Sequence, residues 1–128
     1  MILVDTSVLV DALRSSDPKL PRLFITHHVA ICGITRAEIL HGARDSAHYT
    51  VLERALSDFP QVPILEIHWD AVGRNLYQLR SSGVSVPFQD VVIATVAIEN
   101  RLELWTRDKQ FGLIQQSLPT LTLFQEPP

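Results

Sequence analysis

Residues 1–13, MILVDTSVLVDAL, open with a short apolar run and place a carboxylate, Asp5, at the end of that run. The run over 2–4 predicts a buried strand, and the apolar residues of 7–13 recur at helical spacing, so Asp5 marks a change from strand to helix. An acid at such a junction has two interpretations. It caps the helix that follows, or it belongs to a site at the carboxyl end of the strand.

The rest of the chain continues this alternation of short apolar runs and segments with helical periodicity. Further strands are expected over residues 29–34, 62–67, 102–106 and 121–124, and further helices from residue 18 onward and over 36–44, 48–59, 69–81, 88–100 and 109–116. This order is typical of a sheet whose strands run parallel. The sequence therefore predicts an α/β fold in which a parallel sheet of about five short strands is flanked by helices on both faces.

Length and composition limit the class of protein. The 128 residues, of which 46% are hydrophobic, fit a single domain spanning 1–128. The apolar start lacks the basic segment and cleavage site of a signal peptide, and no run approaches the roughly 20 apolar residues of a membrane span. The lone cysteine, Cys32, excludes an internal disulfide. We therefore expect a cytoplasmic protein that makes no contact with a membrane.

The net charge of −3, from 14 acidic and 11 basic residues, argues against a strongly basic nucleic-acid binder. This conclusion changes if four of the acids form a metal site. The remaining charges then sum to +1, and a bound divalent cation makes the site less repulsive to phosphate.

Four acids lie where the predicted topology collects the carboxyl ends of its strands. In parallel α/β sheets these ends share one edge, and ligands bind in the crevice there. The four are Asp5 after the first strand, Glu38 shortly after the second, Asp90 at the start of the apolar helix over 88–100, and Asp108 two residues after the strand over 102–106. The topology predicts that they converge.

Each acid taken alone also has a purely structural interpretation. Asp5 and Asp108 fit helix N-caps. Thr35 and Glu38 fit the capping-box pattern, and Asp90 suits the positive end of a helix dipole. Capping explains why acids occur at helix starts, but it does not explain why these four segments should meet at one edge of the sheet.

Three segments, MILVDTSVLVDAL, ITRAEILHGA and VPFQDVVIATVAIENRLELWTRDKQF, together resemble PIN domains, and in particular the VapC toxins of toxin–antitoxin pairs. The resemblance runs from residue 1 to about residue 124, although residues 47–84 carry no motif of the family. It implies a metal site and catalytic centre formed by Asp5, Glu38, Asp90 and Asp108. It further implies that Thr6, Ser7 and Thr106 support Asp5.

The chemistry of this acid set agrees with the resemblance. Mg²⁺ and Mn²⁺ prefer oxygen ligands, usually one or two carboxylates together with waters and substrate phosphate oxygens. Such an ion activates water and neutralises charge on a phosphodiester, so no nucleophilic side chain is needed. The residues predict metal-dependent phosphodiester hydrolysis, and the resemblance implies that the substrate is RNA and the enzyme an endoribonuclease.

Further residues are assigned to partners. Arg36, Arg107 and Lys109 neighbour three of the acids and are candidates for binding RNA phosphates, with ordinary surface charge as the alternative. The resemblance implies a small VapB-like antitoxin, contact with DNA only through that antitoxin, and a homodimer. The apolar face of Leu20, Leu23 and Phe24 and the helix around 48–56 are candidates for the antitoxin groove, with core packing as the alternative.

Two other functions remain open from the sequence. A parallel α/β domain with an acid after its first strand could be a phospho-accepting receiver, although the strand over 62–67 ends without an aspartate and the strand over 102–106 lacks a lysine. A PIN-like module that binds RNA or protein without cutting is the third alternative, and DNA is an alternative substrate. The presence of all four acids favours the nuclease.

Overall fold

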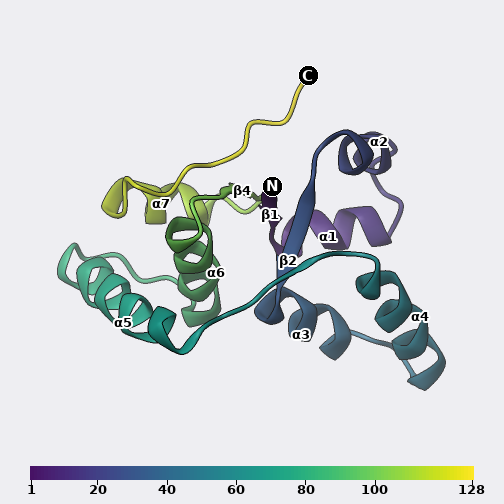
Figure 1. Ribbon diagram of the computed structural model, residues 1–128, viewed down its shortest axis with the longest axis horizontal. Helices are drawn as coiled ribbons and strands as arrows, with labels where there is room; N and C mark the ends of the chain where they lie inside the picture. Colours follow the sequence, from purple (N-terminus) through teal and green to yellow (C-terminus); the bar gives the residue numbers. More distant parts are fainter.

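The computed structural model describes residues 1–128 and contains four strands and seven helices (Figure 1). In chain order the elements are β1 Ile2–Val4, α1 Thr6–Leu13, α2 Lys19–Thr26, β2 Val29–Cys32, α3 Gly33–His41, α4 Ser46–Ser57, β3 Gln61–Val62, α5 Glu66–Ser81, α6 Phe88–Glu99, β4 Glu103–Trp105 and α7 Gln110–Ser117. No helix combines the length and apolar character needed to cross a bilayer.

All strand pairs are parallel, and their order across the sheet is β3-β2-β1-β4. The chain moves outward from β1 to β3 and then returns to the other side of β1, so the direction of winding changes between β1 and β4. The expected α/β class is confirmed. Receiver domains have the flavodoxin-like order 2-1-3-4-5, in which β1 and β4 are not neighbours. The observed order therefore argues against the receiver alternative.

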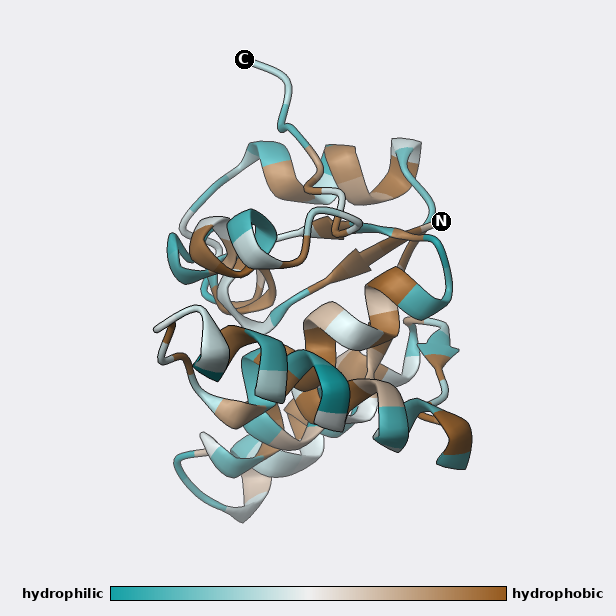
Figure 2. Cartoon of the chain, turned by 90° about the vertical axis from the view of Figure 1, so that its left-hand side faces the viewer, coloured by the Kyte–Doolittle hydropathy of each residue, from teal (hydrophilic) through white to brown (hydrophobic).

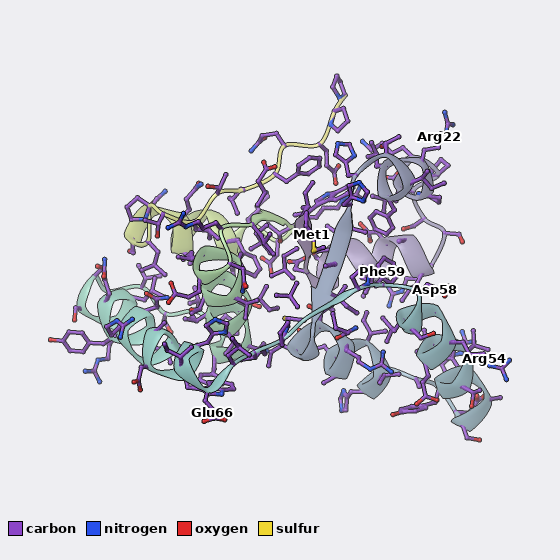
Figure 3. The ribbon with its side chains drawn as sticks, in the orientation of Figure 1. Met1, Arg22, Arg54, Asp58, Phe59 and Glu66 are labelled. Atoms are coloured by element: carbon purple, nitrogen blue, oxygen red, sulfur yellow. The ribbon has the colours of Figure 1, made fainter.

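Two apolar clusters cover the two faces of the sheet because successive strand residues point to opposite sides. Leu3 of β1 and Leu104 of β4 pack with α5, α6 and α7, whereas Val4 and Trp105, their chain neighbours, pack with α1, α2 and α4. The strands at the centre are coloured as hydrophobic in Figure 2. Charged side chains such as Arg22, Arg54 and Glu66 point outward at the periphery (Figure 3).

Two predicted strands differ from the structure. The strand expected over 62–67 is limited to Gln61–Val62, and α5 already begins at Glu66. Pro63 has no N–H to donate to a neighbouring strand, which ends the pairing early. The strand expected over 121–124 is reduced to one parallel bridge between Leu104 and Leu123, so the sheet has four strands and not about five.

Two buried threonines in helices differ in their hydrogen bonding. Thr95 Oγ1 in α6 donates to the Val91 carbonyl at 2.7 Å and accepts from Asn75 Nδ2 at 2.9 Å. Thr35 Oγ1 in α3 has no partner apart from the nearby thiol of Cys32, which is at best a weak one. Leaving a buried hydroxyl without a good partner destabilises the folded state.

We therefore expect Thr35→Val to raise the free energy of unfolding by about 1 kcal/mol, because it removes the unpaired hydroxyl and keeps the side-chain shape. The matched change Thr95→Val removes two hydrogen bonds and leaves the Asn75 amide without its partner. It should therefore lower the free energy of unfolding by about 1–3 kcal/mol. Urea titration of the three proteins measures both effects. A less stable Thr35→Val protein would contradict the interpretation of this hydroxyl.

Candidate active site

The site forms where the winding of the sheet reverses. Asp5 follows β1 and donates its backbone N–H to the Trp105 carbonyl at 3.0 Å, so the ends of β1 and β4 lie side by side. Diverging connections leave a crevice at this point of a parallel sheet, and ligands bind there. Asp108, three residues after β4 ends, leaves the sheet at the same edge.

The Asp5 carboxylate is buried, with 3% of the residue exposed, and it is held from several directions. Ser7 Oγ donates to Oδ1 at 2.7 Å, the Val8 N–H donates to the same oxygen at 3.2 Å, and Thr106 Oγ1 donates to Oδ2. Burial raises the pKa of Asp5 above its ordinary value, and these hydrogen bonds limit the rise. Asp5 therefore serves both as the N-cap of α1 and as an oriented carboxylate at the crevice.

Glu38 approaches from α3. Its Oε1 accepts a hydrogen bond from Thr6 Oγ1 at 2.7 Å, which joins α3 to the start of α1. The capping-box interpretation of Thr35 and Glu38 is wrong, because α3 begins at Gly33 and Thr35 already lies inside it. Glu38 therefore does not cap α3, and its side chain lies toward Thr6, the residue that follows Asp5.

Asp90 lies in the first turn of α6. Its pKa is raised to about 6, first by burial and then by the negative charges of Asp108, Glu38 and Asp5, in that order. These charges belong to three other segments of the chain, so Asp90 lies in an acidic environment. The assignment of the four acids to one metal site stays a prediction.

Asp108 is the most exposed of the four. Its Oδ1 accepts from the Gln110 N–H at 2.9 Å, which supports the start of α7, and its own N–H donates to Thr106 Oγ1 at 3.0 Å. Thr106 therefore connects Asp108 to Asp5 through a single hydroxyl. Ser7 and Thr106 donate to Asp5, as the resemblance implies, whereas Thr6 donates to Glu38 and not to Asp5.

The donor set fits a hard divalent cation by its chemistry. All four candidates are carboxylates, and burial together with the negative charges of the other three raises the pKa of Asp90. No group of three or more acidic, histidine or cysteine side chains is arranged so that it could hold a metal ion. The predicted metal site of four carboxylates is therefore not formed in this structure, and the metal stays a prediction.

The three basic residues predicted to contact RNA differ in their surroundings. Arg36 on α3 is half-buried and Lys109 is exposed, and neither forms an ion pair. Arg107 is bound by the carboxylates of Asp11, Asp17 and Glu126. Its pKa is raised by these partners, the hydrogen bond to Glu126 above all. The guanidinium is therefore engaged within the protein, and its RNA-binding role stays an untested prediction that the geometry does not favour.

The apolar face predicted for the antitoxin is largely core. Leu20 is fully buried, and the Phe24 ring makes edge contacts with Phe59 and Trp105 at 5.8 and 5.3 Å between centroids. A groove of about 590 Å³ lies between α1, α3 and α4, and the helix around 48–56, also predicted for the antitoxin, supplies His48, Val51, Leu52 and Ala55 to its lining. Its lining residues are Val10, Leu13, Arg14, Glu38, Ile39, Gly42, Arg44, His48, Val51, Leu52 and Ala55. Sequence reasoning missed Val10 and Leu13, whose i, i+3 spacing on α1 was the available signal.

Comparison with known proteins identifies the family. Residues 2–115 match the PIN domain. Ribonuclease VapC11 of Mycobacterium tuberculosis is 30% identical over 122 residues, which cover 89% of this chain and 91% of that protein. VapC ribonuclease Mb1587 of Mycobacterium bovis matches to the same extent.

Solved structures agree in fold. The DNA-bound VapBC complex of Salmonella typhimurium contains a chain with a TM-score of 0.84 at 20% identity, covering 97% of this chain and 98% of that one. VapBC2 of Rickettsia felis, bound to a fragment of promoter DNA, gives 0.83 at 21% identity, with coverage of 99% and 100%. Because the family match spans most of the chain, this chain belongs to the PIN domain family.

Proposed function

We propose that residues 1–128 act as one PIN domain, a metal-dependent endoribonuclease that is the toxin of a VapBC-type pair. The acidic environment that Asp5, Glu38 and Asp108 create around Asp90 carries this proposal. Relatives named as ribonucleases supply the substrate class. The proposal implies the cytoplasm as its compartment, because RNA and a freshly made antitoxin meet there.

The four acids would have different roles in binding the metal ion. Asp90 and Asp108 have the fewest hydrogen bonds from side chains and are the best placed to hold Mg²⁺ or Mn²⁺. Asp5 is held by Thr106 and Ser7, and Glu38 by Thr6, so these two carboxylates keep fixed directions toward the crevice. The bound ion would supply an activated water and neutralise charge on the phosphate.

The first test is RNA cleavage by protein freed of antitoxin. We expect cleavage with Mg²⁺ or Mn²⁺ and none in excess EDTA. Asp90→Asn and Glu38→Gln keep the side-chain shape but remove a ligand charge, so each should reduce the rate at least about 100-fold. Glu99→Gln, at the far end of α6 from Asp90, is the matched control and should cleave normally.

Parallel assays on RNA, single-stranded DNA and duplex DNA separate the alternatives. If the protein cleaved DNA but not RNA, the proposed substrate would be wrong and the protein would be a DNA nuclease. Binding of RNA by the wild type without any cleavage under these conditions would favour the non-cleaving PIN-like module. Wild-type rates in both Asp90→Asn and Glu38→Gln would show that the ligand assignment is wrong.

A second test uses the metal-free protein. Asp90 has a pKa of about 6 in the folded state and an ordinary value of 3.8, so between these values the folded state binds more protons than the unfolded state. The stability from its protonation is present below about pH 4 and is lost as pH rises through about 6. In EDTA the free energy of unfolding of the wild type should therefore fall between about pH 5 and pH 7.

Asp90→Asn should flatten this fall and be more stable than the wild type at pH 7 in EDTA by about 1–3 kcal/mol. Added Mn²⁺ should raise the melting temperature of the wild type more than that of the variant, because a ligand that binds only the folded state stabilises it. Glu99→Gln should follow the wild-type pH profile. Equal slopes in wild type and Asp90→Asn would contradict the clustering of charge at this aspartate.

We assign the groove between α1, α3 and α4 to the antitoxin. Its walls carry apolar side chains from α1 and α4, its rim carries Arg14, Arg44 and His48, and one of its lining residues is Glu38. An apolar segment with acidic flanks fits such a groove. Its occupant would lie against one of the four acids and would obstruct the site.

Val51 on α4 lines this groove with 61% of the residue exposed, so Val51→Asp should fold normally and weaken antitoxin binding at least about tenfold. The matched control is Ile25→Asp on α2, where the side chain is 84% exposed and outside the groove. Titration with the antitoxin encoded by the adjacent gene measures both. Equal affinity of the two variants would remove this groove from consideration.

The homodimer implied by the family remains a prediction. Five of the ten exposed large apolar side chains lie between residues 65 and 88, at Leu65, Ile67, Trp69, Tyr77 and Phe88. Light scattering of the toxin alone measures the mass directly.

A further inference from the structure

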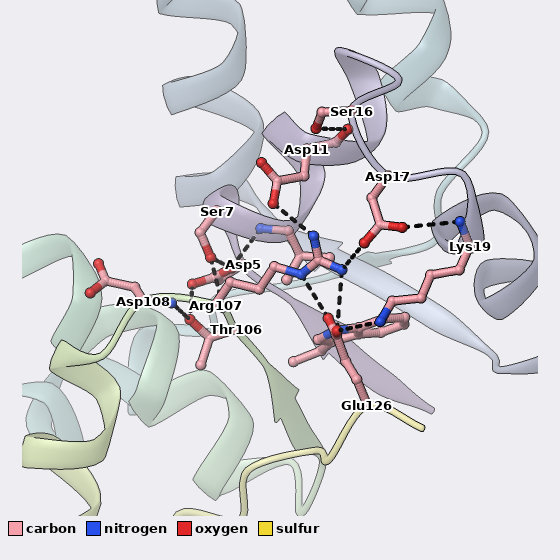
Figure 4. Close-up of polar contacts among 12 residues, drawn as sticks. Asp5, Ser7, Asp11, Ser16, Asp17, Lys19, Thr106, Arg107, Asp108 and Glu126 are labelled. Atoms are coloured by element: carbon pink, nitrogen blue, oxygen red, sulfur yellow. Dashed lines mark hydrogen bonds and ion pairs between the residues drawn. The ribbon is translucent and has the colours of Figure 1, made fainter. Parts of the chain in front are cut away.

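The Arg107 guanidinium forms ion pairs with the carboxylates of Asp11, Asp17 and Glu126 (Figure 4). Nη1 donates to Asp11 Oδ2 at 2.8 Å, and Nη2 donates to Asp17 Oδ2 at 2.6 Å. Glu126 contributes twice, because Oε1 accepts from Nε at 2.7 Å and Oε2 accepts from Nη2 at 3.2 Å. Only 23% of the Arg107 side chain is exposed, which distinguishes this cluster from an ordinary surface ion pair.

Glu126 is also the anchor of the C-terminal segment. Its Oε1 accepts from the indole Nε1 of Trp105 at 2.7 Å, and this indole is fully buried. Phe124 donates its N–H to the Leu104 carbonyl at 2.8 Å and places its ring 4.7 Å from that of Trp105. The PIN match ends at residue 115, so these contacts come from a part of the chain that the family match does not include.

The backbone of Arg107 belongs to the acid site. Its N–H donates to Ser7 Oγ at 2.9 Å, and the same hydroxyl donates to Asp5 Oδ1. The residues on either side contribute as well, since Thr106 donates to Asp5 and Asp108 donates its N–H to Thr106. Arg107 therefore connects two regions of the protein. Its side chain is bound by Glu126, and its backbone N–H is hydrogen-bonded to Ser7 in the site.

We propose that Glu126 is a positioning residue of the active site: by holding the Arg107 side chain, it fixes the segment 106–108 that orients Asp5 and places Asp108. Asp11 and Asp17 each give the guanidinium one bond, whereas Glu126 gives two and connects it to the buried Trp105. The inference rests on the proposed function, because it assigns Asp5 and Asp108 to metal binding.

The experiment compares Glu126→Ala with wild type at a temperature where circular dichroism shows both to be folded. Mn²⁺ affinity is measured by calorimetry without RNA, and kcat and KM are measured for RNA cleavage. We expect Mn²⁺ affinity and kcat each to fall about tenfold, with KM changed less than about twofold, because the defect lies in ligand geometry and not in RNA binding. Glu126→Gln keeps one acceptor oxygen and should recover part of both losses.

Val72→Ala on α5 is the control for a merely structural role. It removes two buried methyl groups and lowers stability, but Val72 contacts neither Arg107 nor the segment 106–108. This variant should keep wild-type Mn²⁺ affinity, as should Gln125→Ala on the neighbouring exposed residue. If Glu126→Ala does not fold, Glu126→Gln takes its place in the comparison.

The outcomes distinguish failure of the positioning role of Glu126 from failure of the proposed function. Wild-type Mn²⁺ affinity and kcat in Glu126→Ala, or in Glu126→Gln where that variant replaces it, would overturn the positioning role. Equal losses of affinity in Val72→Ala and the Glu126 variant would also overturn it, because they would reflect general destabilisation. Failure of the wild type itself to bind Mn²⁺ would overturn the proposed function together with this inference.

Discussion

The buried carboxylate of Asp5 is the constraint on which the site depends. Removing a charge from water costs several kcal/mol unless hydrogen bonds or a cation compensate it. The compensating donors come from two places, Ser7 and Val8 at the start of α1 and Thr106 after β4. The requirement to satisfy one carboxylate therefore joins the ends of two neighbouring strands, and it sets the direction in which the chain leaves β4 toward Asp108.

The remaining packing opposes the repulsion among the acids. Seven successive residues of α6, Val91–Ala97, are buried, so the helix cannot move away from the sheet without exposing a large apolar surface. Asp90 is carried at the start of this helix and must stay near the other acids. Hydrophobic burial along α6 thus offsets an unfavourable electrostatic arrangement, and a bound cation would relieve what remains of the repulsion.

Sequence reasoning succeeded for the α/β fold class and for α6, because the order of the elements and a long apolar run determine them. The assignment of the four acids rests on the rule that parallel strands end at one edge, and it stays a prediction. The partners of Arg107 could not be predicted, because Asp11 and Glu126 lie far from it in the chain and only tertiary packing brings them together. The burial of Leu20 could not be predicted for the same reason, because an apolar helix face does not reveal whether it meets solvent or the core.

Glu38 connects the proposed inhibition to the proposed chemistry. It lines the groove between α1, α3 and α4, and it also raises the pKa of Asp90 across the crevice. A partner in the groove would therefore contact a carboxylate of the active site directly. An allosteric mechanism would require two distinct sites and two states of the protein. Direct contact with Glu38 would require neither a separate site nor a second state. Since the groove and the acids share a residue, a partner bound in the groove would obstruct the site without any change in the fold.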